Sequence, residues 1–344
     1  MRKTFVSETI IGGELRSSDN PQKGAVSEPM KVWVFGASNI DIIARSNEPI
    51  IAADSNVGAV EKAPGGVGRN IAAALKALGF DVALVTAIAD DADGWLISSE
   101  LEKLGIKLSS KPYTGKDDRT GVYCCIMDGD GSLVCAVNDM KINRRLSPDL
   151  VKEYKDSLES CDYVVFEANL PHKTIKALAS LDVPLVADCV STIKADKLAD
   201  VLEDLYLLKA NFAEASALAG IEGAEPDRNG LDRIMNALIA KGLRRAIISL
   251  GRGGAFCYEV TGTGTRGYEE KVIAGLNVVS TNGCGDVLLA AFLRSLAEGY
   301  PMDEALRLGQ VASGLNSESM EAVSPQLSFK KVIEKAEEKY EQIS

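Results

Sequence analysis

The chain has 344 residues, which suits one large domain or two smaller ones and excludes a short peptide or an isolated binding motif. Hydrophobic residues make up 46% of the sequence, enough to fill a sizeable core. The 38 basic and 49 acidic side chains give a net charge of −11, which repels nucleic acids and acidic membranes. We therefore expect a globular protein without a nucleic-acid or membrane partner, and a local basic pocket for an anion remains open.

The numbers of cysteine and histidine residues limit the kinds of metal and catalytic site that the chain can form. Seven scattered cysteines form no C-x-x-C pair, which favours free thiols and a cytoplasmic location. No stretch of about 18 uninterrupted apolar residues occurs, and the N-terminus has no continuous apolar segment, so neither a membrane span nor a secretion signal is expected. His172 is the single histidine, which excludes multi-histidine zinc sites, and we expect it on the surface at a helix start. Carboxylates and backbone dipoles are then the natural carriers of any catalysis.

In chain order, residues 1–29 show no sustained periodicity and are expected to form a flexible extension, with the fold spanning 30–344. Short apolar runs predict buried strands at residues 32–35, 82–87, 163–166, 184–187 and 246–250. Helical patterns at 70–78, 98–104 and 234–241 each end at a glycine, the usual residue just past a helix C-terminus. Strands that alternate with helices predict an α/β fold with a mostly parallel sheet.

One region departs from this alternation. Gly121 to Met127 and Ser132 to Val137 are β-rich and flank an Asp/Gly turn at residues 128–131, which predicts an antiparallel hairpin. Pro49 to Ala63 has an extended, poorly helical composition. We expect these segments to form a small β-sheet lid, over about 48–63 and 118–140, that stands off the main sheet.

The strongest local motif is Thr281-Asn282-Gly283-Cys284-Gly285-Asp286, followed by an apolar helix at 287–293. Backbone N–H groups at the start of a helix, together with the positive end of its dipole, form a cradle for a phosphate or a developing oxyanion. Asp286 should lie in the first helical turn, within reach of a bound ligand. The alternative is a tight glycine turn with a carboxylate that merely stabilises the helix.

A second glycine motif runs from Pro64 to Asn70 and leads into an alanine-rich helix. The glycine pair Gly65 and Gly66 lets a ligand approach the backbone, and the Asn70 amide can bind hydroxyls. Its G-G-x-G spacing differs from the dinucleotide fingerprint, and no hydrophobic strand precedes it, so an NAD site is not favoured. A G-x-x-x-x-G-K-[ST] motif is absent from the sequence, which excludes a P-loop NTPase.

Further polar residues follow predicted strands, at the edge where parallel sheets bind ligands. They are Asn39 and Asp41 after the first strand, Asn211 and Glu214 after residues 205–209, and the segment Ser249 to Gly254. They could bind hydroxyls, hydrated Mg²⁺ or a nucleotide. Equally, the first pair could cap a turn, the second could form a helix capping box, and the third could be a flexible turn.

The order of these motifs over residues 31 to about 330 resembles the ribokinase-like carbohydrate kinases, also called the phosphofructokinase B family. The shared pattern is a strand with N-x-D, G-G-x-x-x-N, a lid hairpin, N-x-x-E, a G-x-x-G turn and a C-terminal G-x-G-D. The resemblance implies a three-layer α/β/α domain with a lid, ATP and Mg²⁺ as cofactors, and a small-molecule nucleoside or sugar as substrate. Within the family, Ala53 to Asn56, Pro64 to Asn70 and Val137 to Met140 are similar to segments of pseudouridine kinases.

The same resemblance assigns roles to individual residues. It makes Asp286 the catalytic base and Gly283, Cys284 and Gly285 the anion hole for the transferred phosphoryl group. It places the substrate against Asn39, Asp41, Gly65, Gly66, Asn70, Asn138 and Asn169. It places the nucleotide against Asn211, Glu214, Ser249, Gly251, Gly254 and Asn316, with Asn211 and Glu214 organising Mg²⁺. The implied reaction transfers the γ-phosphoryl group of ATP to the 5′-hydroxyl of pseudouridine.

Three departures from the family pattern bear on this assignment. Ser280 stands where many relatives carry an aspartate linked to a monovalent cation, which leaves a potassium requirement open. Cys284 replaces the more usual alanine, and a thiol at a helix N-terminus is expected to have a lowered pKa. Asn169 stands where ribokinases place an acidic residue, which favours a nucleoside over a free pentose.

Two alternatives remain at this point. The acceptor could be ribose, another nucleoside or a sugar phosphate, although few basic residues besides Arg69 and Arg119 lie near the motifs to bind a second phosphate. The chain could also be a catalytically silent nucleoside-binding protein of the same fold, against which the retained Asp286 argues. The apolar side of a small lid often pairs with a second copy, so we expect a homodimer through the lid.

Overall fold

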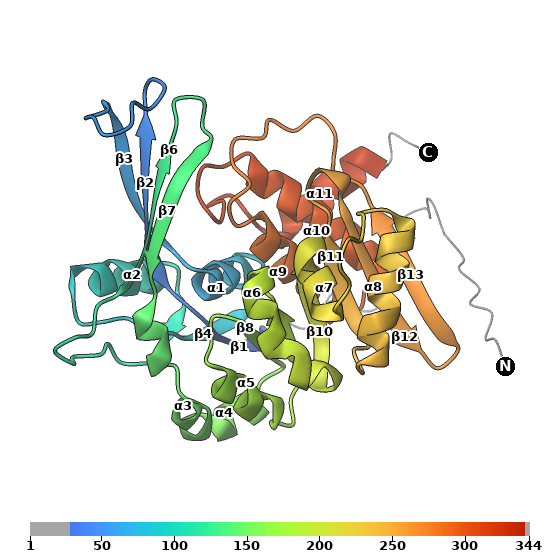
Figure 1. The fold of residues 1–344 in the computed structure, drawn as a ribbon. Coiled ribbons are helices and arrows are strands. Elements are labelled where there is room, and N and C mark those ends of the chain that lie inside the picture. The colour runs from blue at the N-terminus through green and yellow to red at the C-terminus, as the bar shows by residue number, and fades with distance from the viewer. Residues whose placement is uncertain (1–27, 341–344) are drawn as a thin grey trace.

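A computed structural model describes residues 28–340, so most of the predicted extension, residues 1–27, lies outside the described residues. Nine strands form one sheet in the order β13-β12-β11-β10-β9-β8-β1-β4-β5 (Figure 1). Their bounds are β1 Lys31–Phe35, β4 Asp81–Val85, β5 Lys107–Leu108, β8 Tyr163–Glu167, β9 Leu185–Asp188, β10 Leu205–Asn211, β11 Arg245–Ser249, β12 Ala255–Thr261 and β13 Gly264–Glu270. All pairs from β5 to β11 are parallel, while β12 and β13 are antiparallel, which confirms the mostly parallel sheet.

Helices cover both faces of this sheet, because successive strand side chains point to opposite sides. In β1, Val32 and Val34 join one buried cluster, whereas Trp33 and Phe35 join another. The first cluster packs against α1 (Val67–Ala77), α2 (Ala92–Lys103), α9 (Cys284–Ala297), α10 (Met302–Ser317) and α11 (Phe329–Tyr340). The second packs against α3 (Pro148–Glu153), α4 (Lys155–Glu159), α5 (His172–Ala179), α6 (Thr192–Ala195), α7 (Phe212–Ala219) and α8 (Arg228–Ala240). The three-layer α/β/α prediction is therefore confirmed.

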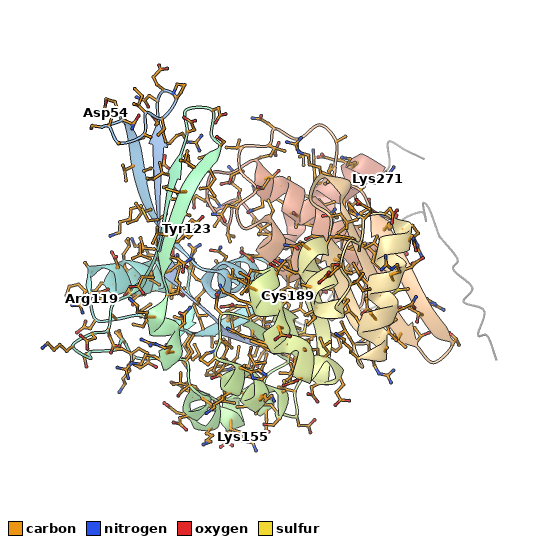
Figure 2. All side chains as sticks on the ribbon, viewed as in Figure 1. Asp54, Arg119, Tyr123, Lys155, Cys189 and Lys271 are labelled. Carbon is orange, nitrogen blue, oxygen red and sulfur yellow. The ribbon has the colours of Figure 1, made fainter. Side chains whose placement is uncertain are left out.

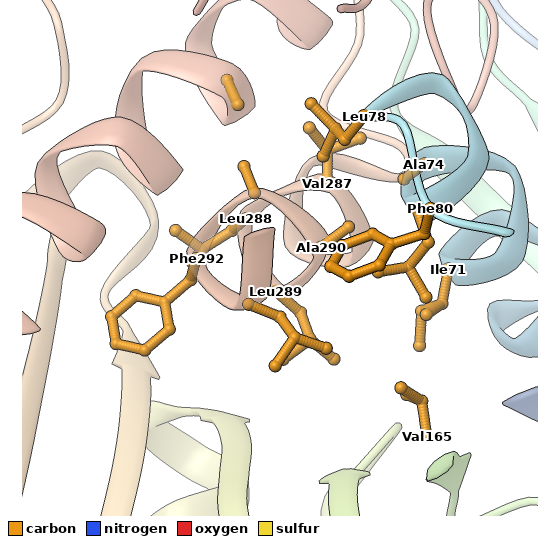
Figure 3. Close-up of a cluster of buried hydrophobic side chains, with 14 of the residues drawn as sticks. Ile71, Ala74, Leu78, Phe80, Val165, Val287, Leu288, Leu289, Ala290 and Phe292 are labelled. Atoms are coloured by element: carbon orange, nitrogen blue, oxygen red, sulfur yellow. The ribbon is translucent and has the colours of Figure 1, made fainter. Parts of the chain in front are cut away.

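Helix α9, which begins at the predicted phosphate cradle, is buried along most of its length. Its residues Val287 to Leu293 are all at most 2% exposed, as expected for a helix that is apolar all round. Figure 3 shows Val287 and Ala290 beside Ile71, Leu78 and Phe80, which come from α1 and the turn that follows it. Burying each large apolar side chain contributes roughly 1.5–3 kcal/mol. The N-terminus of α9 is thus fixed by the core beneath it.

The lid is a separate four-stranded sheet in the order β3-β2-β6-β7. Its strands are β2 Asn39–Ser46, β3 Gly58–Gly65, β6 Gly121–Met127 and β7 Leu133–Asp139, and the predicted hairpin of β6 and β7 is confirmed as antiparallel. Strand β3 begins only at Gly58, later than the predicted extended segment. Strand β2, with Asn39 and Asp41, proves to be an inner strand of the lid, and Figure 2 places Asp54 at the lid's outer tip.

Several further features of the described residues concern the rarer residue types and the helices. His172 opens α5, and its half-exposed side chain lies 3.3 Å from the Asp200 carboxylate, as expected of a surface residue at a helix start. All seven cysteines are free thiols. Within residues 28–340, no helix combines the length and the apolar character that crossing a membrane requires. The described part of the chain also contains three 3₁₀ helices: η1 Lys141–Arg145, η2 Asp196–Asp204 and η3 Gly251–Gly253.

Candidate active site

Buried polar side chains meet where β8, β9 and β10 end and α9 begins. Such groups are rare in a protein interior unless each has a partner, so their clustering marks a candidate site. At most 8% of each residue is exposed for Asn70, Glu167, Asp188, Lys209, Glu214 and Asp286. The charges of Glu167, Asp188 and Lys209 all act on Asp286, which places the four groups in one electrostatic cluster.

The start of α9 has the geometry that its motif predicts. Gly283 precedes the helix with a φ of +71°, a left-handed conformation that glycine adopts without strain. Asp286 lies in the first turn. The Cys284 N–H donates to the Thr281 carbonyl over a long 3.3 Å, while the next N–H groups of the turn have no acceptor within the helix. These groups and the helix dipole would favour an anion at this turn.

The electrostatics of Asp286 suit a proton acceptor. Burial raises the pKa of its carboxyl to about 7, although the nearby Lys209 ammonium opposes the rise, and Asp188 adds to it. Asn70, on α1, donates a hydrogen bond that favours the charged form. A carboxyl group that titrates near neutral pH can take a proton from a substrate hydroxyl and release it afterwards.

Lys209 is a member of the site that the sequence motifs do not mark. Its ammonium lies 2.8 Å from the Asp188 carboxylate and is almost fully buried. A Cβ atom on Gly285 would lie 2.9 Å from Nζ, so the ammonium lies directly against the first turn of α9. Burial alone would lower the pKa of Lys209, but Asp188, Asp286 and Glu214 raise it above its ordinary value. A fixed positive charge therefore lies beside the predicted anion hole.

Glu167 is a second residue that no motif marks. Its fully buried carboxylate accepts hydrogen bonds from the N–H groups of Ala37, at 2.6 Å, and Asn169, at 2.5 Å. Burial raises its pKa to about 7. It thereby ties the turn after β1 to the turn after β8, which carries the predicted substrate residue Asn169. The Asn169 side chain in turn accepts from Lys194, at 2.5 Å.

The predicted substrate residues on β2 lie where the lid joins the large sheet. The Asn39 amide donates to Asp41 at 2.6 Å, and Asn39 pairs with Gly65 across the β2–β3 ladder. A Cβ atom on Gly65 would lie 2.2 Å from an Asp41 carboxylate oxygen, so a larger residue there would displace the Asp41 side chain. Gly66 continues with a φ of +101° at the start of α1. Burial raises the pKa of Asp41, while the hydrogen bond from Asn39 opposes the rise.

Asn138 lies on the lid, in register with the same residues. Tyr123 is opposite Asp41 in the β2–β6 pair and opposite Asn138 in the β6–β7 pair. Cross-strand neighbours share one face of a sheet, so the three side chains form a row on one face of the lid. The aromatic ring in this row, labelled in Figure 2, was not predicted as a site residue.

The residues predicted to bind the nucleotide lie at the start of α7 and at the turn that follows β11. Asn211 and Glu214 form a complete capping box at the start of α7: the Asn211 side chain accepts from the Glu214 N–H, and Glu214 accepts from the Asn211 N–H, each at 2.8 Å. The capping box that the sequence allowed for this pair is therefore present in the fold. Ser249 ends β11, Gly251 opens η3 with a φ of +57°, and Gly254 follows η3 with a φ of +99°.

Cys284 and Asn316 are two further predicted site residues near the cradle. Burial raises the pKa of the Cys284 thiol, so the expected lowering at a helix N-terminus is wrong, because desolvation of the thiolate outweighs the hydrogen bonds from Asn316 and Ser313 that would lower it. Asn316 has no exposed surface, and its amide is hydrogen bonded to the backbone of Asn282, Ala322 and Ser324.

Comparison with known proteins gives a consistent result. The model of the pfkB family carbohydrate kinases matches residues 30–328. The chain is similar to pseudouridine kinase from Escherichia coli K12, with 28% identity over 304 residues that cover 88% of this chain and 95% of the relative. Among solved structures, it is similar to a carbohydrate kinase from Agrobacterium tumefaciens, with 29% identity, a TM-score of 0.74 and 89% and 97% of the two chains covered. It also shares the fold of Arabidopsis thaliana ribokinase complexed with ribose and ATP, with 20% identity, a TM-score of 0.76 and 90% and 99% covered.

Proposed function

Because the chain belongs to the pfkB family of carbohydrate kinases, ATP-dependent phosphotransferases that act on small sugars or nucleosides, we propose that it phosphorylates the 5′-hydroxyl of pseudouridine. One observation carries the proposed chemistry: a buried carboxyl with a pKa near 7, Asp286, stands in the first turn of α9 beside an anion cradle and the Lys209 ammonium. A proton acceptor and a phosphate site are thereby adjacent.

In the proposed reaction, Asp286 takes the proton of the substrate 5′-hydroxyl while the oxygen of that hydroxyl forms a bond to the γ-phosphorus of ATP. The bond between that phosphorus and the bridging oxygen breaks, and ADP leaves with the electron pair. The N–H groups of the Gly283–Gly285 turn and the Lys209 ammonium stabilise the charge on the transferred group. Closure of the lid over the acceptor would exclude water, which otherwise competes as the acceptor.

The cofactors fit the residues present. The cradle of N–H groups beside a lysine is suited to the phosphates of ATP. Mg²⁺ in such sites keeps several waters and takes one or two carboxylates besides the phosphates, and it neutralises phosphate charge when bound. Within residues 28–340, no cluster of three acidic, histidine or cysteine side chains forms a ready metal cage. We propose that Glu214, aided by Asn211, organises the hydrated ion, and that Ser249, Gly251 and Gly254 line the nucleotide.

Support for pseudouridine comes from the substrate side. The match to the Escherichia coli enzyme covers 88% of this chain and 95% of that enzyme. Asn39 and Asp41 offer paired donors and acceptors for ribose hydroxyls, and Tyr123 offers an aromatic face between Asp41 and Asn138. Asn169 presents a neutral amide, held by Lys194, to the same edge of the sheet.

A second candidate is phosphorylation of ribose itself. The fold is shared with a ribokinase that has been seen with ribose and ATP, and the Asn39–Asp41 pair would serve a free pentose equally well. Asp286 and the cradle would act in the same way on either acceptor. The two candidate acceptors differ only in the base, which pseudouridine would place against the lid and which ribose lacks.

We also propose that the protein is a homodimer through the lid. Large apolar side chains on β3 and β7 are more than half exposed, including Val60, Leu133 and Val137, and β7 is an open edge strand. Exposed apolar edge strands favour pairing with a second copy. Sedimentation equilibrium at micromolar concentration should give twice the chain mass, and a monomer would refute the proposal.

The deciding experiment measures kcat/KM for pseudouridine, uridine, ribose and fructose 6-phosphate separately, with Mg²⁺ and ATP and with ADP release as the signal. The proposal expects pseudouridine to give the highest kcat/KM. A higher value for ribose would select the second candidate, and turnover of none would favour a silent binding protein. Asp286→Asn is the matched control, since ADP release that survives this change does not come from the proposed site.

A further inference from the structure

The turn that forms the anion hole, residues 281–285, rests against the loop after α10. The Val279 and Ser280 N–H groups donate to the Ser317 carbonyl at 2.8 and 3.1 Å, which ties the approach to the turn to the end of α10. A Cβ atom on Gly283 would lie 1.8 Å from the Ala322 carbonyl oxygen, so the two backbones are in direct contact. The position of the turn therefore depends on a neighbouring loop as well as on its own helix.

Asn316 lies at the centre of this contact. Its side-chain N–H₂ donates to the Ala322 carbonyl at 3.0 Å and to the Asn282 carbonyl at 3.4 Å. Its Oδ1 accepts from the Ser324 N–H at 2.7 Å. The side chain has no exposed surface. One amide thus bonds the turn on one side and both ends of the 322–324 segment on the other.

We infer that Asn316 is a positioning residue, which holds the anion-hole turn in place by cross-linking it to the loop after α10. The inference rests on the proposed function. Only an amide supplies donors to two carbonyls and an acceptor to one N–H from a single short side chain. An apolar side chain would leave these buried groups without partners, and the turn would move to satisfy them. A displacement of about 1 Å at a reacting group can reduce the rate about 100-fold.

The first test compares steady-state kinetics of Asn316→Leu and Asn316→Asp with those of the unaltered protein. We expect kcat to fall about 10- to 100-fold while KM for the acceptor is unchanged, because the acceptor side of the site is untouched. Ser295→Ala is the matched control: this buried hydroxyl of α9 bonds only the carbonyl of Ala291 among the described contacts, at 2.8 Å, and its removal should leave kcat unchanged. An unchanged kcat in both Asn316 variants contradicts the inference.

The Asn316→Asp variant adds a readout that general loss of stability would not move. Its new carboxyl can donate to the Ala322 carbonyl only when protonated, whereas the carboxylate repels both carbonyl oxygens. The ratio of variant to unaltered kcat should therefore rise as the pH is lowered. A ratio that is constant with pH contradicts the positioning role. This variant is nearly isosteric, so it also carries the test if Asn316→Leu fails to fold.

Hydrogen exchange separates this inference from the proposed function. In Asn316→Leu or Asn316→Asp, the amides of residues 277–285 should exchange faster than in the unaltered protein and in Ser295→Ala. If no acceptor is turned over, the proposed function fails, yet the exchange rates still decide whether Asn316 holds the turn. Exchange of this segment at the unaltered rate in folded Asn316 variants overturns the inference.

Discussion

Replacing Asp286 by asparagine should separate catalysis from stability. Removal of a general base typically costs 10²–10⁴ in rate, so we expect kcat for Asp286→Asn to fall about 1,000-fold. Nucleoside binding, measured by calorimetry without ATP, should change little because the amide keeps the shape of the carboxyl. In the unaltered protein, kcat/KM should rise with pH and level off above the Asp286 pKa of about 7. The residual activity of the variant should lack this rise.

The same substitution should stabilise the fold at high pH. The folded pKa of Asp286 is raised from its ordinary value of 3.8 to about 7, so the unfolded chain ionises first and stability falls as the pH rises between these values. At about 1.4 kcal/mol per tenfold change in proton affinity, the upper limit of this loss is about 4 kcal/mol. The melting temperature of Asp286→Asn should therefore exceed that of the unaltered protein by more at pH 8 than at pH 4. Full activity in the variant, or an advantage that shrinks with rising pH, would refute this reasoning.

Three further predictions concern the residues around the start of α9. Gly285→Ala should lower kcat with little loss of stability, because the new methyl group meets only the movable end of Lys209. Gly283→Ala should lower the melting temperature, because its φ of +71° disfavours alanine and the new Cβ atom would lie 1.8 Å from the Ala322 carbonyl oxygen. Equal melting temperatures of the two variants would contradict this. Iodoacetamide should label Cys284 slowly at pH 8, because burial raises the thiol pKa, and peptide mass spectrometry would reveal rapid labelling if the argument is wrong. Replacing potassium by tetramethylammonium should leave kcat unchanged, because Ser280 brings no carboxylate, and a large fall would contradict this.

The sequence predicted the fold well where local signals agree with the tertiary structure. The buried strands around β1 appear as apolar runs, and the glycine that follows each predicted helix marks its end. The lid was predicted less completely. Strand β2, which carries Asn39 and Asp41, has no distinctive sequence pattern. Its place inside the lid is set by its pairing with β3 and β6, and no local pattern encodes that pairing.

The candidate site, too, was predictable only where its residues are contiguous in the sequence. Asp286 and its glycine turn are contiguous in sequence, so the motif was visible. Glu167 and Lys209 were missed because their roles depend on contacts with Ala37 and Gly285, which are distant in the chain. The available signal was a charged residue at the end of an otherwise apolar strand, since such a group must find a buried partner. The Cys284 pKa was predicted in the wrong direction because burial cannot be read from a helix terminus alone.

The central claim is transfer of the ATP γ-phosphoryl group to the 5′-oxygen of pseudouridine with Asp286 as the base. Its most direct test incubates the protein with Mg²⁺, γ-labelled ATP and pseudouridine, and locates the label in the product by mass spectrometry and phosphorus NMR. We predict one labelled phosphate on the 5′-oxygen, formed by the unaltered protein and not by Asp286→Asn on the same time scale. Label released only as inorganic phosphate, or found on another oxygen, would contradict the account.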